Sequence, residues 1–160
     1  MRSFGDQLIA FKEHRVWRVY GTNPGGYVFK EQFGGGAPYF NTIAVDVERI
    51  YMADLNGLSV YDGMSVSPFI RDMFEPLWRK VNKSALNQMC AVLFQNRYYL
   101  AVPMGNSTVN NALIVLNMKD NTILYYEDIK IESMLATPEA IYATSSSLPG
   151  KVLDLKYDSW

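Results

Sequence analysis

The sequence contains a single cysteine, Cys90, and a single histidine, His14. One cysteine can form neither an intrachain disulfide nor a thiolate cage around a metal, and one histidine leaves His-based metal sites and catalytic triads almost without ligands. Cys90 lies in the apolar run "QMCAVLF", which predicts a buried, unreactive core thiol. His14 lies in the polar break "KEH", where we expect a solvated side chain.

The sequence also lacks an excess of charge of either sign and any long hydrophobic run. Its formal net charge is −1 and its pI about 5.8, so composition indicates neither a nucleic-acid nor an anionic-membrane partner. No segment approaches the roughly 20 apolar residues of a membrane span. The start, "MRSFGDQLIAF", lacks a signal-peptide pattern. We therefore expect synthesis in the cytoplasm, no membrane partner and no cofactor.

Catalytic patterns are missing as well. No serine stands in a G-x-S-x-G elbow. The neighbouring carboxylates of Glu127 and Asp128 fall on a predicted strand, where adjacent side chains point to opposite faces. The Asp-box of propeller sialidases is not found either. These absences disfavour an enzyme, and a propeller glycoside hydrolase is only a remote alternative.

What the sequence does contain is aromatic side chains, at 14% of 160 residues, with 11 tyrosines among them. Aromatic residues favour β-strands. Four stretches share one pattern of an apolar run, a short polar break and an aromatic-centred strand: "LIAFKEHRVWRVYG", "TIAVDVERIYMADLNG", "CAVLFQNRYYLAVPMG" and "MLATPEAIYATSSS". Their aligned aromatics are Trp17, Tyr51, Tyr99 and Tyr142, which are 34, 48 and 43 residues apart. The breaks "KEH", "DVE", "QN" and "TPE" predict tight hairpin turns.

A further strand follows each pair, namely "YVFKEQF", "LSVYDG", "NALIVLNM" and "KVLDLKY", and "TILYYED" adds a fourth to the third unit. Consecutive antiparallel strands in units of about 40 residues are typical of β-propeller blades. We predict an all-β fold of about four antiparallel, β-propeller-like blades. The first and last blades are expected to be incomplete, with a fourth strand due where the chain ends in "LKYDSW". Residues 1–160 are thus interpreted as one propeller-like segment of a longer chain, or a partial propeller completed by another chain.

Residues 67–86, "SPFIRDMFEPLWRKVNKSAL", break this pattern with apolar residues at helical spacing. Ser67 and Pro68 predict a helix start, and Glu75-Pro76 a second one, so we expect two short helices with a break between them. The apolar face is expected to pack on the sheets. The alternative is a partner-binding role for exposed Phe74 and Trp78 together with Arg79, because exposed aromatic patches mark interfaces. Arg79, Lys80 and Lys83 are interpreted as a solvated face.

Two acidic turns and three loops allow alternative interpretations. Asp54, Asn56 and Asp62 suggest a cation site, but the EF-hand spacing fails at positions five and twelve. We interpret Asn56-Gly57 as a type I′ hairpin pair and Asp62-Gly63 as a second turn. The glycines of "FGGGAPYF" predict a flexible crossing between blades and "TNPGG", 22–26, a hairpin loop. The loop at 104–111 is expected to be a solvent loop, with ligand or partner contacts as the alternative.

These motifs resemble phage and prophage virion proteins of the tail or head–tail region that contain β-propeller-like segments. The matching stretches are "LIAFKEHRVWRVYG", "FGGGAPYFNTIAV", "RIYMADLNGLSVYDGMSVSPFIRDMF", "AVLFQNRYYLAVP" and "NALIVLNMKDNTILYYED", which cover most of residues 7 to 128. Gly36 stands where that family often has another small residue or cysteine. The resemblance implies a structural role in the virion and no catalytic residues.

Two functions follow as expectations. The first is a non-enzymatic structural or interaction module of a virion, whose partners are other virion subunits or further copies of itself. The second is a carbohydrate- or ligand-binding propeller, in which tyrosines at strand ends and the loops at 22–26 and 104–111 would hold a glycan.

Overall fold

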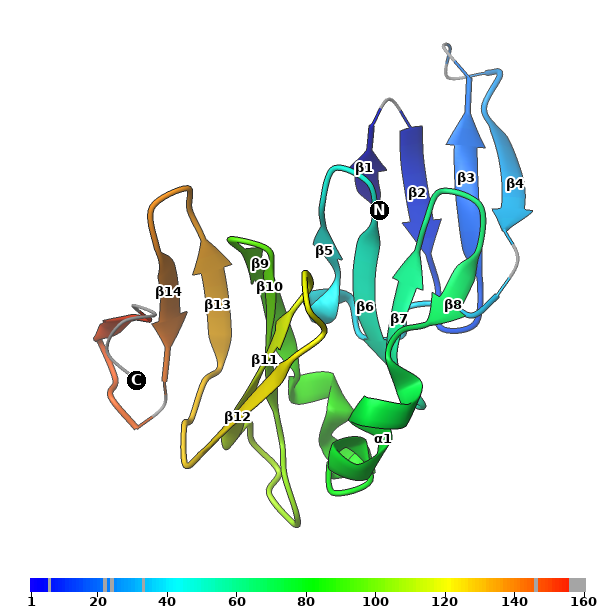
Figure 1. Cartoon of the computed structure of the whole chain (residues 1–160). Coiled ribbons are helices and arrows are strands. Elements are labelled where there is room, and N and C mark those ends of the chain that lie inside the picture. Colours follow the sequence, from blue (N-terminus) through cyan, green and yellow to red (C-terminus); the bar gives the residue numbers. More distant parts are fainter. Residues whose placement is uncertain (6, 22, 24, 33, 146, 156–160) are drawn as a thin grey trace. The chain divides into compact units, whose positions relative to one another are not determined.

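The computed structural model describes residues 1–5, 7–21, 23, 25–32, 34–145 and 147–155 (Figure 1). The chain divides into two compact units, residues 1–71 and 72–160. Within the described ranges the chain is mostly β-strand and forms antiparallel sheets, as the sequence predicts. Each sheet is a simple meander, in which strands that follow one another in the sequence lie side by side.

The first unit contains two four-stranded sheets. The first sheet consists of β1 (Arg2–Phe4), β2 (Gln7–Phe11), β3 (Val16–Tyr20) and β4 (Val28–Gln32). A short 3-10 helix, η1 (Phe40–Thr42), leads into the second sheet of β5 (Ala44–Val45), β6 (Ile50–Asp54), β7 (Gly57–Tyr61) and β8 (Val66–Pro68).

The second unit begins within helix α1 (Arg71–Trp78) and continues through the 3-10 helix η2 (Lys83–Gln88). The third sheet consists of β9 (Cys90–Phe94), β10 (Arg97–Val102), β11 (Ala112–Asn117) and β12 (Ile123–Glu127). The fourth sheet has three strands in the described residues, β13 (Ser133–Ala136), β14 (Ile141–Thr144) and β15 (Val152–Asp154). The expected fourth strand at "LKYDSW" lies almost entirely outside the described residues, as does part of the loop at 22–26.

The hairpins between the first two strands of all four sheets have the same register. Tyr51 pairs with Ala44, Tyr99 with Val92 and Tyr142 with Leu135, in each case a partner seven residues earlier. In the first sheet the corresponding pair is Ile9 with Arg2. We call Ile9, Tyr51, Tyr99 and Tyr142 the register positions. We call the sheet face that carries a register position its front, and the opposite face its back.

The strand order of the first sheet corrects the alignment of the first repeat. Trp17 lies on β3, the third strand of its sheet, and not on the second strand as the sequence suggested. The strand β1 precedes the stretch from which the sequence alignment started, so the first sheet has four strands and is not incomplete. Counted from Ile9, the register positions are 42, 48 and 43 residues apart, which is more regular than the spacing counted from Trp17.

In the first unit the front of the first sheet packs against the back of the second. Ile9 and Val16 lie in one buried cluster with Ile50 and Met52, the two neighbours of register position Tyr51. Because side chains alternate along a strand, Ile50 and Met52 project from the face opposite Tyr51. The ring of Phe4 meets that of Tyr61 edge-on at 6.0 Å between centroids in the same layer.

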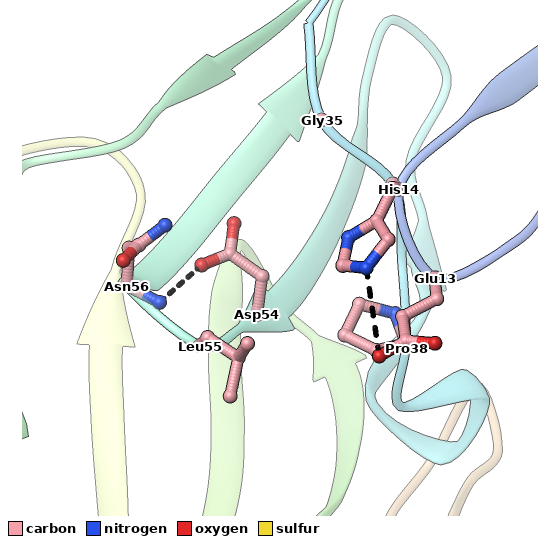
Figure 2. Close-up of a pocket in the computed structure, with 8 residues that line it drawn as sticks. Glu13, His14, Gly35, Pro38, Asp54, Leu55 and Asn56 are labelled. Atoms are coloured by element: carbon pink, nitrogen blue, oxygen red, sulfur yellow. Dashed lines mark hydrogen bonds and ion pairs between the residues drawn. The ribbon is translucent and has the colours of Figure 1, made fainter.

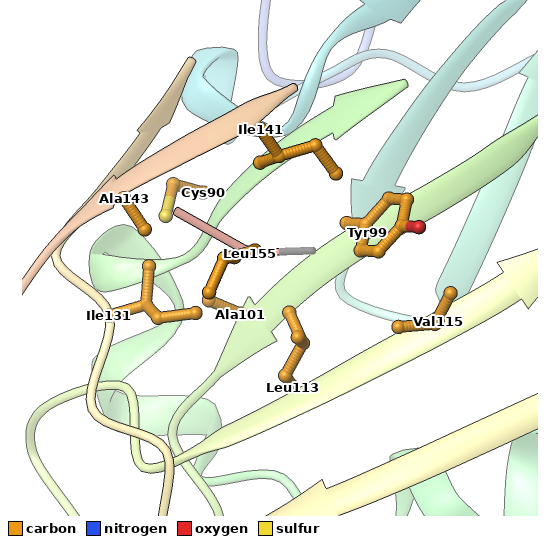
Figure 3. Close-up of a cluster of buried hydrophobic side chains, with 9 residues drawn as sticks. All are labelled: Cys90, Tyr99, Ala101, Leu113, Val115, Ile131, Ile141, Ala143 and Leu155. Carbon is orange, nitrogen blue, oxygen red and sulfur yellow. The ribbon is translucent and has the colours of Figure 1, made fainter. Parts of the chain in front are cut away.

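The second unit repeats this arrangement. Tyr99 and Ala101 on the front of the third sheet pack against Ile141 and Ala143 on the back of the fourth (Figure 3). Cys90 belongs to the same cluster, so its predicted burial is confirmed. In both units, therefore, the front of one sheet covers the back of the next.

The helical segment is confirmed, but its predicted boundaries are wrong. Ser67 and Pro68 belong to β8 and pair with β7, which removes them as the start of a helix. Proline is tolerated there because β8 is an edge strand. Pro76 lies inside α1 rather than at a second start, and the break comes between α1 and η2.

The turn at Asn56-Gly57 is a hairpin, but not with the predicted geometry. Asp54 pairs with Gly57, so Leu55 and Asn56 form the turn, and only Gly57 of the expected pair has a positive φ, at 135°. The pair with two positive φ angles is Gln95-Asn96, at 47° and 60°. The predicted turn at Asp62-Gly63 is confirmed by a bond from the Asp62 amide to the Ser65 carbonyl.

The glycine-rich crossing between the first two sheets is packed rather than loose. The amide of Ala37 donates to the carbonyl oxygen of Lys12 at 2.9 Å. A Cβ at Gly36 would collide with that same oxygen and lie 2.6 Å from the amide nitrogen of Arg15. Glycine is used here because the backbone of the crossing lies directly against the turn between β2 and β3.

Candidate functional site

Of the three residues predicted as partner contacts, Phe74 and Trp78 lie on α1 and Arg79 directly follows it. Phe74 and Trp78 are only 1% and 3% exposed, and their rings stack at 5.4 Å. Burial of an apolar helix face is therefore confirmed, and the alternative in which these two aromatics are exposed is wrong. The buried stripe runs through Phe74, Trp78 and Val81, whereas Met73 on the neighbouring face is 58% exposed. This one-residue rotation of the helix places the aromatics in the core.

Arg79 does lie on the surface, with 77% of its side chain exposed. Its guanidinium pairs with Glu75 one turn earlier, at 2.6 Å between Nη2 and Oε1. Exposed pairs of this spacing contribute little to stability, about 0.3–0.5 kcal/mol. Arg79 is thus the only one of the three with a side chain available to a partner, and its role there stays a prediction.

Lys83 differs from the solvated cation that the sequence suggested. Its Nζ lies 4.1 Å from the centroid of the Trp78 ring and donates to the carbonyl oxygen of Trp78 at 2.6 Å. Burial lowers the pKa of the Lys83 ammonium to about 8. The Lys83 side chain lies over the indole, where a cation–π contact replaces part of the hydration of its ammonium group.

The acidic turns use their carboxylates locally. Asp54 accepts hydrogen bonds from the Asn56 amide at 2.6 Å and the Ser59 hydroxyl at 2.5 Å. Asp62 accepts from the amides of Met64 and Ser65, both at 2.9 Å, and these bonds lower the pKa of its carboxyl. Both acids therefore stabilise turns. In the part of the chain that the structure describes, no group of three or more acidic, His or Cys side chains is arranged to hold a metal.

A small polar pocket lies in the first unit between the β2–β3 turn and the β6–β7 turn (Figure 2). Glu13 and His14 line one side, with Nε2 and Oε1 3.7 Å apart, and Asp54 and Asn56 line the other. His14 is exposed, as predicted. The volume is about 130 Å³, well below the roughly 300–1,000 Å³ of pockets that enclose a drug-sized ligand.

A wider depression adjoins the same turn. It is open, about 490 Å³ in volume, and lined by Lys12, Glu13, His14, Arg15 and Trp17. Arg15 pairs with Glu31 at 3.3 Å at its edge. An indole beside charged and polar side chains offers both a stacking surface and hydrogen-bond donors. This arrangement suits a polar ligand with an apolar face.

The loop at 104–111 is held in place by asparagines that the sequence gave no reason to single out. Asn110 is 3% exposed and donates through Nδ2 to the carbonyl oxygens of Gln88 and Ile131, at 2.6 and 2.8 Å. Asn111 accepts from the Met104 amide at 2.6 Å. The inner part of this loop is therefore part of the core and not a free solvent loop.

Cys90 offers no reactive thiol. It is 6% exposed within the cluster of the second unit, and burial raises its pKa to about 12 (Figure 3). A thiol in such surroundings stays protonated and unreactive near neutral pH.

Comparison with known proteins does not assign the chain to a family. No protein-family model matches the sequence, and no curated protein matches it either. In the described ranges, no helix is both long and apolar enough to cross a membrane.

Proposed function

We propose that the chain is a non-enzymatic structural module of a phage or prophage virion, in the tail or the head–tail region. The observation that carries the proposal is the shared hairpin register of the four sheets, with front-to-back packing in each unit. Antiparallel meander sheets that follow one another in the sequence and pack face to face are compatible with the blades of a β-propeller. The virion location is supported by the resemblance of residues 7 to 128 to virion proteins with such segments.

The positions of the acidic, thiol and imidazole side chains support a structural role. Asp54 and Asp62 are occupied in turns, Cys90 is buried, and His14 is a solvated turn residue. The buried side chains of the strands pack between the sheets. Rigid sheets of this kind present loops and edges to neighbouring subunits, which is the mechanism that we propose.

Particles from a strain that carries the gene test this proposal. We expect the chain in gradient-purified virions by mass spectrometry, at a fixed ratio to the major capsid protein, and gold-labelled antibodies at the tail or the neck. Disruption of the gene should give particles that lack the labelled structure. Intact, infectious particles without this chain would overturn the proposal.

A ligand-binding role is the second candidate, because the depression at Trp17 combines an indole with charged side chains. A glycan would stack on the ring and donate to Glu13 or accept from Lys12 and Arg15. The test is a glycan array with the whole chain and with Trp17→Ala. Saturable binding that the substitution abolishes would favour this role. Arg79→Ala, far from the depression in the sequence and on another element, is the matched control.

A further inference from the structure

In the part of the chain that the structure describes, each unit has a largely apolar sheet face that is open. The back of the first sheet carries Leu8, Ala10, Trp17, Val19 and Phe29 in register across β2, β3 and β4. Leu8 is 39% exposed and Phe29 57%. The front of the fourth sheet carries Leu135, Tyr142 and Val152, which are 63%, 38% and 65% exposed.

Exposure at equivalent positions shows that these faces are exceptional. The register positions Ile9, Tyr51 and Tyr99 are 0–5% exposed, whereas Tyr142 is 38% exposed. Residues that flank a register position are buried in the later sheets, with Ile50 and Ile141 both at 0%. Leu8, the equivalent residue of the first sheet, is open. Side chains of the type that packs inside the other sheets are therefore uncovered here.

The two open faces are of complementary kinds. Inside each unit a front covers a back, and the two open faces described above are one back, on the first sheet, and one front, on the fourth. Two polar contacts on them lie within the chain. Ser133 and Thr144 share a hydrogen bond of 2.8 Å, and Arg15 pairs with Glu31 at 3.3 Å. Asp154 lies opposite Tyr142 in the register, so the front of the fourth sheet also carries an exposed carboxylate, which docking must desolvate or pair.

We infer that the front of the fourth sheet of one copy docks on the back of the first sheet of a second copy of this chain. The inference rests on the proposed propeller-like module and names its partner. A contact between two different faces is heterologous, so it generates a ring when the rotation closes. Two copies bring eight sheets together, the upper end of the typical four to eight blades, and three copies would exceed it. The assembly is a head-to-tail dimer with two identical contacts.

Substitutions that block one face at a time test this arrangement in the whole chain. Tyr142→Arg blocks the front of the fourth sheet and Phe29→Arg the back of the first. Both side chains are exposed, so the variants should keep the circular dichroism spectrum and melting behaviour of the wild type. Val47→Arg, at a residue 88% exposed in the β5–β6 turn, carries the same charge change on neither face and serves as the control.

Sedimentation equilibrium should give twice the 18.2 kDa chain mass for the wild type and Val47→Arg, and the single chain mass for each blocked variant alone. A mixture of the two blocked variants should form a heterodimer through its one intact contact, at least tenfold weaker than the wild-type dimer. A blocked variant that still dimerises alone would overturn the head-to-tail contact. A mass that keeps rising with concentration would overturn the closed dimer.

A monomeric wild-type chain would overturn this inference and leave the proposed function standing, if the chain is found in virions. A dimer with the predicted variant pattern, in a chain missing from virions, would support this inference and overturn the proposed function. The oligomeric state and the particle content therefore separate the two.

Discussion

The side-chain amide of Asn110 donates a hydrogen bond of 2.8 Å to the carbonyl oxygen of Ile131. A second bond from the same nitrogen reaches the Gln88 carbonyl oxygen at 2.6 Å. Asn110 thus joins the end of η2, the loop after β10 and the segment that leads into β13. Neither carbonyl lies in a regular strand, so this one side chain replaces two backbone bonds in the second unit.

Asn110→Ala should lower the free energy of unfolding by about 1–3 kcal/mol, because it leaves two carbonyl oxygens without their donor. Urea unfolding followed by tryptophan fluorescence measures the change. Asn106→Ala removes an exposed asparagine from the same loop and should change the free energy by less than about 0.5 kcal/mol. Equal effects of the two substitutions would contradict the bridging role of Asn110.

Gly36→Ala should also destabilise the chain, by about 1–3 kcal/mol, the usual cost of forcing an extra methyl into a packed site. The new Cβ would meet the Lys12 carbonyl and the Arg15 amide, which are backbone atoms and cannot rotate away. Gly35→Ala is the matched control, since nothing lies within 4 Å of its Cβ position. Thermal unfolding of both variants measures the difference in stability. A Gly36→Ala variant as stable as the wild type would show that the crossing is loose, as its sequence suggested.

The strand order of the sheets could be predicted because each hairpin has a distinct local signal. Polar breaks such as "DVE" separate apolar strands, and the antiparallel meanders follow from these short connections. The position of the first repeat could not be predicted so well. Its register position holds Ile9 and not an aromatic residue. The aromatic residue Trp17 lies on the next strand, so the sequence alignment matched β3 of the first sheet to the second strand of the other sheets. β1 has only three residues and gives little periodicity.

The exposure of Phe74 and Trp78, two of the three candidate contacts, could not be predicted for a related reason. Spacing along residues 70–81 is compatible with two helix faces one residue apart, and only tertiary packing decides which is buried. It buries Phe74 and Trp78 and exposes Met73. Asn110 carries no signal at all, because a polar loop residue with buried partners has the same sequence context as a solvated one.

Lys83 predicts a pH dependence of stability. Its pKa of about 8 in the folded chain lies below the ordinary value of 10.5, so the unfolded chain binds more protons between these values. Stability due to this group should therefore rise with pH from about 8 to about 10.5 and stay constant below 8. The difference in unfolding free energy between wild type and Lys83→Met measures it. Cys90, whose pKa is raised, acts in the opposite direction but is common to both proteins and cancels.

Lys80→Met removes one positive charge from an exposed residue of the same segment and controls for the change in net charge. The wild-type advantage over Lys83→Met should increase at each step from pH 8 to pH 10. A difference that stays flat over this range would contradict the burial of the ammonium against the indole.

Cys90 should react with a thiol reagent only when the chain unfolds. At pH 8 its raised pKa keeps the thiol protonated, and 6% exposure keeps a bulky aromatic disulfide out. Modification should be negligible in native buffer and complete in denaturing urea. Val47→Cys in a Cys90→Ala background places the thiol at an exposed turn and should react at once. Rapid labelling of native Cys90 would mean that the third and fourth sheets separate readily, which the cluster around Tyr99 and Ile141 argues against.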